Sequence, residues 1–91
     1  MDRKQIFERV NKILLKILAS KPTPDSMKVT VLDWNTDIFT DVGLDSLESL
    51  DLLTGLEEEF DVNPDQYEAV DKRKISQIVD YVIELSNGRK L

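Results

Sequence analysis

The chain has 91 residues, of which 41% are hydrophobic and 33% are charged. This length suits one small domain with one modest core, and the composition is that of a folded chain rather than a disordered one. The sequence contains no Cys and no His. Disulfides and thiolate metal sites are therefore excluded, and the residue most used in acid–base catalysis and imidazole metal binding is missing. We expect neither an enzyme nor a metal site.

The net charge of −6 is unevenly distributed along the chain. Residues 41–61 hold eight acids and no Lys or Arg, whereas the other residues hold ten acids and twelve bases. An acidic surface argues against nucleic acid as a partner and favours basic protein partners, which it attracts electrostatically. A solvated helix face is the alternative explanation. The eight acids are Asp41, Asp45, Glu48, Asp51, Glu57, Glu58, Glu59 and Asp61.

No apolar run approaches the length of a membrane span, and the first residues, Met1–Gln5, lack the apolar region of a signal peptide. We therefore expect no transmembrane segment, and a chain that works in the cytoplasm as a monomer.

A first amphipathic helix is predicted over about 3–18. Its apolar residues recur at steps of three and four, with charged residues mostly between them. Asp2 can cap its start, with Gln5 reaching back, and Pro22 and Pro24 prevent its continuation. The apolar positions are Ile6, Phe7, Val10, Ile13, Leu14, Ile17 and Leu18.

A long loop over 19–40 follows. Val29, Val31 and Trp34 alternate with polar neighbours, which suggests a short extended piece near 28–32. A loop of this length is uncommon unless it packs or has a function. We interpret Val31, Trp34 and Ile38 as a lid over the core, and contact with a partner or ligand is the alternative.

A second helix is predicted over about 45–60. Asp45 as N-cap and Glu48 three residues later form a capping box. Gly55 lies in mid-helix, where it costs about 1 kcal/mol relative to Ala, and close packing against another element would explain it. The apolar half of the helix holds Leu50, Leu52, Leu53, Leu56 and Phe60.

Leu47 interrupts the acidic half of this helix. At 100° per residue it projects beside Asp51 and Glu58. An exposed Leu among acids suggests an apolar anchor that faces a partner, although single exposed leucines are ordinary on any protein.

The remaining chain predicts two more helices. Pro64 can open a short helix over about 65–71, and Asn87-Gly88 ends a last helix over about 74–86, followed by a frayed tail. We therefore predict an all-α fold, a four-helix bundle with three longer helices and one short one, as a single domain over 1–91. The last helix carries its apolar residues at Ile75, Ile78, Val79, Val82 and Ile83.

Ser46 is the candidate functional residue. A helix N-terminus favours a negative group, and Gly43 permits a tight turn that leaves the hydroxyl exposed. Without His, and with Lys28 as the nearest basic residue in sequence, nothing local activates this hydroxyl as a nucleophile. It therefore suits a modification made by another enzyme better than a hydrolase. A Ser that only supports the helix start is the plain alternative.

The motif Gly43-Leu44-Asp45-Ser46-Leu47, followed by Leu52, Leu56, Glu57-Glu58-Glu59-Phe60 and Asp80-Tyr81-Val82, resembles the acyl carrier proteins. The resemblance runs over 38–60 and 74–86, and as a pattern over helix one. It implies a bundle of acyl-carrier type whose Ser46 carries 4′-phosphopantetheine, transferred from coenzyme A by a separate Mg-dependent phosphopantetheinyl transferase. The thiol of this arm would carry acyl groups as thioesters between enzymes of fatty acid, lipid or polyketide biosynthesis.

The resemblance also implies a docking face. Acyl-loading and acyl-processing enzymes would bring basic patches to it, and the residues in docking positions are Asp45, Leu47, Glu48, Asp51 and Glu58. The alternative function is an acidic helical interaction module without a prosthetic group. A calcium site is disfavoured, since Asp41, Asp45 and Glu48 do not follow an EF-hand spacing.

The sequence departs from the family in several places. The first loop is longer than usual for fatty-acid carriers and contains Trp34, and the usual buried Ile residues are missing around Asn63-Pro64 and Lys72. These departures favour a specialised, free-standing carrier. They leave the third helix, and the acyl pocket that it would line, undetermined, together with the cargo.

Overall fold

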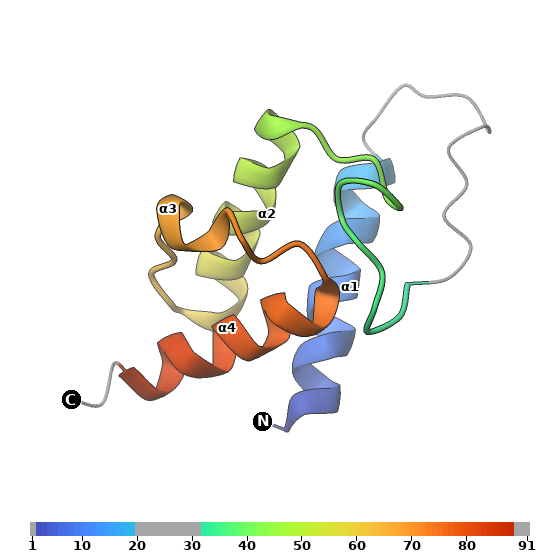
Figure 1. Cartoon of the computed structure of the whole chain (residues 1–91). Helices are drawn as coiled ribbons and strands as arrows, with labels where there is room; N and C mark the ends of the chain where they lie inside the picture. Colours follow the sequence, from blue (N-terminus) through green and yellow to red (C-terminus); the bar gives the residue numbers. More distant parts are fainter. Residues whose placement is uncertain (1, 20–31, 89–91) are drawn as a thin grey trace.

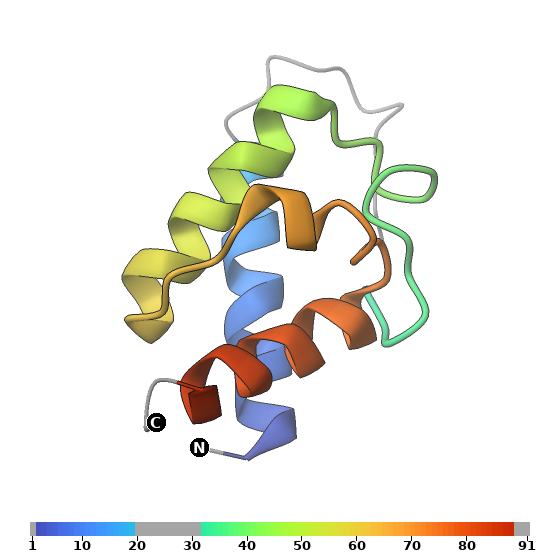
Figure 2. The same ribbon diagram turned by 60° about the vertical axis from the view of Figure 1, so that its left-hand side comes forward.

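The computed structural model describes residues 2–19 and 32–88 of the chain. Within these ranges it contains four helices, α1 (Arg3–Ala19), α2 (Ser46–Phe60), α3 (Gln66–Ala69) and α4 (Ile75–Gly88). In both ribbon views α1 and α2 run in opposite directions, α4 crosses them, and α3 lies beside α2 (Figures 1 and 2). The predicted all-α bundle of three longer helices and one short one is confirmed.

Some predictions fall on residues outside the described ranges. These are the extended piece near 28–32 apart from Leu32, the lid role of Val31, and the tail after Gly88. Within the described ranges, no helix combines the length and the apolar character that a membrane span needs.

The core is formed by one face of each long helix together with the loop that precedes α2. The predicted cap of α1 is formed. The Gln5 N–H donates to the Asp2 carboxylate at 2.8 Å, and the Asp2 N–H donates to the side-chain carbonyl of Gln5 at 3.0 Å. Ile38 belongs to the core, and Trp34 packs against it, so the lid interpretation of these two residues is confirmed. The buried apolar residues of this cluster are Ile6, Val10, Leu14, Ile38, Val42, Leu44, Leu52, Leu56, Ile75, Ile78, Val79 and Val82.

At Gly55, α2 approaches α1 too closely to leave room for a side chain. A Cβ at this position would lie 2.6 Å from Cγ2 of Ile13, well inside contact distance. Glycine is therefore needed for the approach of the two helices, which confirms the packing explanation of this mid-helix glycine.

The loop before α2 also caps the start of α4. The Ile75 N–H donates to the Thr36 carbonyl at 3.0 Å, and the Ser76 N–H donates to the Trp34 carbonyl at 2.9 Å. These bonds satisfy N–H groups that a helix start otherwise leaves unpaired. An isolated antiparallel bridge between Asp37 and Lys74 continues the same contact.

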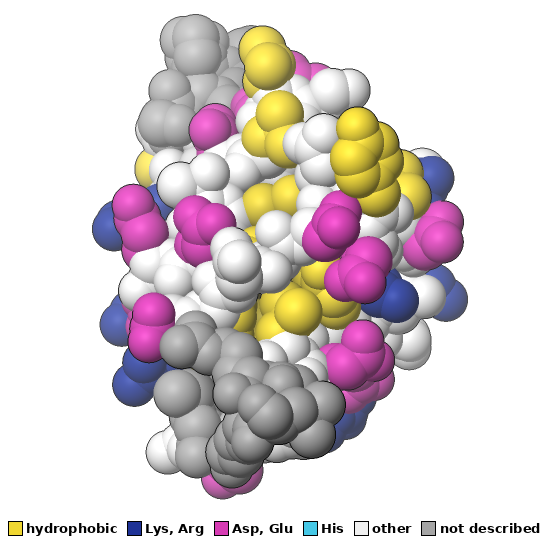
Figure 3. Space-filling view, turned by 90° about the vertical axis from the view of Figure 1, so that its left-hand side faces the viewer, with side chains coloured by type: hydrophobic (Ala, Val, Ile, Leu, Met, Phe, Trp, Pro, Cys, Tyr) yellow, Lys and Arg dark blue, Asp and Glu magenta, His cyan; other side chains and the backbone are white. Residues whose placement is uncertain are grey.

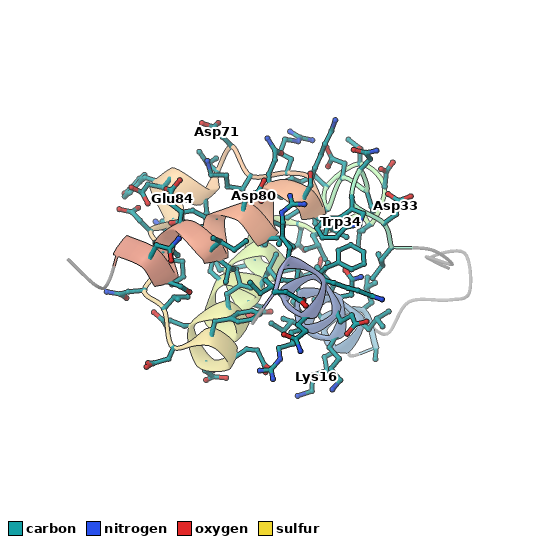
Figure 4. All side chains as sticks on the ribbon, turned by 90° about the horizontal axis from the view of Figure 1, so that it is seen from below. Lys16, Asp33, Trp34, Asp71, Asp80 and Glu84 are labelled. Atoms are coloured by element: carbon teal, nitrogen blue, oxygen red, sulfur yellow. The ribbon has the colours of Figure 1, made fainter. Side chains whose placement is uncertain are left out.

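The side chain of Trp34 packs against α1. Its ring stacks on Phe7 with centroids 4.2 Å apart, and the guanidinium of Arg3 lies 4.7 Å from the ring centroid. Arg3 also pairs with Asp80 of α4 at 2.8 Å, so Arg3 links Trp34 and α1 to α4; Figure 4 labels Trp34 and Asp80.

The prediction for the third helix was wrong in its extent. The helix spans only Gln66–Ala69, and its cap is Asp65, whose carboxylate accepts the Tyr67 N–H at 2.7 Å, rather than a helix opened by Pro64. The chain leaves the helix early because Arg73 and Lys74 pair with the loop before α2, where the Arg73 carbonyl accepts the Ile38 N–H.

Candidate functional site

The turn that delivers Ser46 is anchored on both sides. Gly43 has a φ of 85°, a left-handed conformation that glycine adopts without strain. Val42 and Leu44, its neighbours, are buried, and their N–H groups donate to the carbonyls of Asp37 and Ile38. The turn is therefore rigid where it meets the core, while Ser46, the first residue of α2, is exposed.

The capping box next to Ser46 forms as predicted. The Glu48 N–H donates to the Asp45 carboxylate at 2.8 Å, and the Asp45 N–H donates to the Glu48 carboxylate at 3.0 Å. Asp45 and Glu48 therefore make the capping bonds that start α2, and the Ser46 hydroxyl takes no part in them.

Ser49, the second serine of α2, differs from Ser46. Its hydroxyl donates to the Ser46 carbonyl at 2.7 Å and its side chain is half-buried. The two serines are separated by less than one helical turn, so they form a matched pair. Only Ser46 combines an exposed hydroxyl with the first helical position.

An apolar pocket with a volume of about 350 Å³ begins at Ser46 and extends between α2, α3 and α4. The pocket that the sequence left undetermined is therefore present. The face that contains it shows a band of apolar side chains with acidic side chains on both sides (Figure 3). Its lining residues are Ile38, Phe39, Ser46, Ser49, Leu50, Leu52, Leu53, Leu56, Gln66, Tyr67, Ala69, Val70, Lys72, Ile78 and Tyr81.

The mouth of the pocket carries unusually exposed apolar side chains. Tyr67 is 81% exposed and Val70 is 64% exposed, although both line the pocket from the α3 side. Leu47 is 73% exposed on the adjoining first turn of α2, as expected for an apolar anchor. Exposed apolar side chains that lie together, rather than singly, are typical of sites that bind a ligand or partner.

The five predicted docking residues fall into two groups. Leu47, Asp51 and Glu58 are exposed, and their spacing places them on one outward face of α2. Asp45 and Glu48 lie at the same end but also form the capping box, and Glu48 is half-buried. Within the described residues, no group of three or more acidic side chains is arranged to hold a metal ion.

Tyr81 holds α3 against α4. Its buried hydroxyl accepts the Asp65 N–H at 2.9 Å and donates to the Glu68 carboxylate at 3.0 Å. Burial raises the pKa of Tyr81 above its usual range, so the hydroxyl keeps its proton at neutral pH and remains a donor.

Sequence reasoning gave no role at the pocket to Lys72 or Tyr67. Lys28 is the nearest basic residue to Ser46 in sequence, but Lys72 lines the same pocket as Ser46. Tyr67 likewise reaches the pocket from a helix too short to show a periodic pattern. No local signal reveals either residue, because the chain segments that place them meet only in the folded bundle.

Comparison with known proteins gives the family. Residues 14–82 match the family described as the phosphopantetheine attachment site. The acyl carrier protein of Clostridium acetobutylicum is 31% identical over 77 residues, which is 85% of this chain and 91% of that protein. The chain therefore belongs to the acyl carrier protein family, whose members carry 4′-phosphopantetheine covalently.

Two organellar relatives extend the comparison. The mitochondrial acyl carrier protein of Saccharomyces cerevisiae is 28% identical over 82 residues, 90% of this chain. The chloroplastic acyl carrier protein of Brassica napus is 31% identical over 86 residues, 94% of this chain. This chain spans only 63% and 59% of the lengths of these two relatives.

The residues at the start of α2 fit a phosphopantetheine arm. Ser46 offers an exposed hydroxyl at a helix N-terminus, where backbone N–H groups and the helix dipole favour a phosphodiester. The apolar pocket starts at the same residue, so a group carried on the arm has a cavity within reach.

Proposed function

We propose that this chain is an acyl carrier whose Ser46 holds 4′-phosphopantetheine, and whose acyl groups are attached to the thiol of that arm as thioesters. The observation that carries the proposal is the exposed Ser46 hydroxyl at the edge of an apolar pocket. The chain has no Cys, so the arm would supply its only thiol.

The attachment itself requires a second protein. The Ser46 oxygen would form a bond to the phosphorus of the phosphopantetheinyl group, the pyrophosphate bond of coenzyme A would break, and adenosine 3′,5′-bisphosphate would leave. The hydroxyl proton needs a base, and the chain contains no His. A phosphopantetheinyl transferase would supply that base, which makes this chain a substrate and a carrier rather than an enzyme.

The exposed acidic face of α2 supports docking to basic partners. Leu47 would enter an apolar contact while Asp51 and Glu58 pair with basic side chains around it. Asp45 and Glu48 would take part as well, but their capping role means that substituting them also weakens the start of α2.

We place the carrier in the biosynthesis of fatty acids, other lipids or polyketides, as a cytoplasmic monomer that serves acyl-loading and acyl-processing enzymes. The support is that the relatives compared above are acyl carrier proteins and that an apolar pocket lies beside Ser46.

The test is to incubate the purified chain with coenzyme A and a broad-specificity phosphopantetheinyl transferase, and to follow its intact mass. We expect the addition of one phosphopantetheinyl group, no addition to Ser46→Ala, and full addition to the matched control Ser49→Ala. An unmodified wild-type chain, or a modified Ser46→Ala, would overturn the assignment.

The alternative, an acidic interaction module without a prosthetic group, is favoured by the exposed Leu47 among acids. It predicts salt-sensitive partner binding that is indifferent to Ser46→Ala and to coenzyme A. The carrier proposal instead predicts that Asp51→Lys combined with Glu58→Lys slows phosphopantetheinylation by the transferase while leaving the fold intact, as judged by circular dichroism.

A further inference from the structure

One lining residue of the pocket differs in kind from all the others. Lys72 is the single formally charged side chain among the pocket residues within the described part of the chain. It is half-buried, and its neighbours in the lining are mostly aliphatic or aromatic, such as Leu53, Val70 and Ile78. A lysine in this position places a positive charge on the wall of an otherwise apolar cavity.

The ammonium group of Lys72 is only weakly balanced. It lies 5.7 Å from the centroid of the Tyr81 ring, a cation–π contact. The Glu68 carboxylate accepts the Tyr81 hydroxyl, and Asp37 pairs with Arg73. Among the ion pairs recorded for the described residues, none involves Lys72.

The backbone holds Lys72 at this place. Its N–H donates to the Ala69 carbonyl at 2.9 Å, which closes the turn after α3. The next residue, Arg73, accepts the Ile38 N–H through its carbonyl. Backbone hydrogen bonds at Lys72 and at the next residue therefore hold the backbone here. The aliphatic stem of Lys72 can then lie along the pocket wall while the ammonium remains near the cavity.

An acyl group that fills the pocket changes the surroundings of this charge. A plain hydrocarbon chain would displace water from the ammonium and offer it nothing in return, which is unfavourable. A carboxylate at the end of the chain would pair with the ammonium. Asp51, Glu57, Glu58 and Glu59 of α2 are exposed, and no acid of α2 lines the pocket, so Lys72 is the charged lining residue that a negative cargo group would meet there.

We propose that the pocket selects acyl groups that carry a terminal carboxylate, with Lys72 as the specificity-determining residue. This inference rests on the proposed carrier function. The ligand is a dicarboxylic acyl group held on the arm as a half-thioester, bound in the pocket by its methylene chain and at Lys72 by its free carboxylate. The pocket volume of about 350 Å³ is at the lower end of small-molecule sites, roughly 300–1,000 Å³.

The experiment loads the chain from three coenzyme A thioesters with the transferase. The acyl groups are octanoyl, octanedioyl and the methyl ester of octanedioyl, so the last two differ in charge at matched length. Hydroxylamine then cleaves each thioester, and the rate is divided by that of the same acyl group on free pantetheine. Burial in the pocket slows cleavage.

We expect octanedioyl to be protected about fivefold more than octanoyl or the methyl ester, the effect of one partly exposed ion pair. Lys72→Met, which keeps the stem and removes the charge, should abolish this preference. Lys74→Met is the matched control, because Lys74 is exposed and does not line the pocket, and it should keep the preference.

The outcomes separate the two proposals. Absence of loading in the intact mass overturns the carrier function, and the cargo inference with it. Normal loading with equal protection of the three acyl groups overturns only the cargo inference. If Lys72→Met changes the protection of all three equally, the ammonium interacts with the phosphodiester or the rest of the arm that they share, which also overturns it.

Discussion

The two sides of α2 are built in opposite ways. On the α1 side, Gly55 meets Ile13 without room for a Cβ, and Val10 and Leu14 are fully buried. On the α3 side, the short helix buries none of its residues, and Tyr67 and Val70 are largely exposed. The comparison indicates that stability comes from one side of the helix that begins at Ser46, while the apolar pocket lies on the other.

The physical difference lies in what holds each side together. The α1 side, which we call the closed side, is held by apolar side chains that pack between two long helices. The α3 side, which we call the open side, has a helix of four residues, too short to be stable by itself, and it is attached through the hydroxyl of Tyr81. We therefore expect the open side to be the less stable of the two.

The largest expected effect comes from a matched pair of leucine truncations. Leu14→Ala removes a fully buried side chain on the closed side and should lower the free energy of unfolding by about 2–5 kcal/mol. Leu50→Ala, at a pocket residue that is 43% exposed, should cost less than about 1 kcal/mol. Urea unfolding followed by the fluorescence of Trp34, the only tryptophan, measures both. Equal costs would refute the contrast between the two sides.

The second effect tests the helix contact itself. Gly55→Ala improves helix propensity but places a Cβ 2.6 Å from Cγ2 of Ile13, a methyl fixed close to its own backbone. We expect a net loss of about 1–3 kcal/mol in the free energy of unfolding.

Ile13→Leu supplies the control for this contact, because leucine has no methyl on Cβ at the point of overlap. Introduced into Gly55→Ala, it should recover part of the lost stability, giving a coupling that non-contacting residues would not show. A Gly55→Ala variant as stable as the wild type would mean that the two helices separate without cost.

The third effect lies on the open side. Tyr81→Phe removes the hydroxyl that accepts the Asp65 N–H and donates to Glu68, and should cost about 0.5–2 kcal/mol. Hydrogen exchange should become faster for the amides of α3 than for those of α1. Tyr67→Phe is the matched control, since that ring is exposed, and it should leave exchange unchanged. A uniform acceleration over all helices would show that Tyr81 supports the whole core instead.

Much of this structure was predictable from local sequence signals. The capping box of Asp45 and Glu48, and the glycine at position 55, each depend on neighbours a few residues away or on a simple steric rule, and both were predictable. The exposed place of Ser46 followed from the same helix start. These features need only periodicity, capping chemistry and the size of a side chain.

What sequence reasoning missed depends on contacts between distant segments. Trp34 was predicted to pack, but its stacking on Phe7 and its carbonyl bond to Ser76 required the fold. The third helix ends early because Arg73 and Lys74 pair with the loop before α2, a competition that no local pattern shows. The position of Lys72 at the pocket follows from that early ending.

The smallest expected effect concerns Asp37, which joins the loop before α2 to the segment after α3. Its carboxylate accepts the N–H groups of Thr40 and Phe39 and pairs with Arg73 at 3.1 Å. The hydrogen bond from Thr40 is the main cause that lowers the pKa of Asp37 from 3.8 to about 2, and the Arg73 side chain adds to it. Because the folded pKa lies below the unfolded one, the stabilisation is complete above about pH 4 and is lost as the pH falls through about 2.

Asp37→Asn tests this, because it keeps an oxygen acceptor for the two N–H groups but removes the charge. We expect it to be less stable than the wild type by about 1 kcal/mol at pH 7, with the difference shrinking between pH 4 and pH 2 in urea unfolding. Asp71→Asn, at an exposed position, should show no such convergence. Arg73 also lies over the ring of Phe39, 5.1 Å from its centroid, and Phe39 lines the pocket. A constant difference in stability at every pH would show that Asp37 acts through neutral hydrogen bonds alone, and that its pairing with the charge of Arg73 adds nothing.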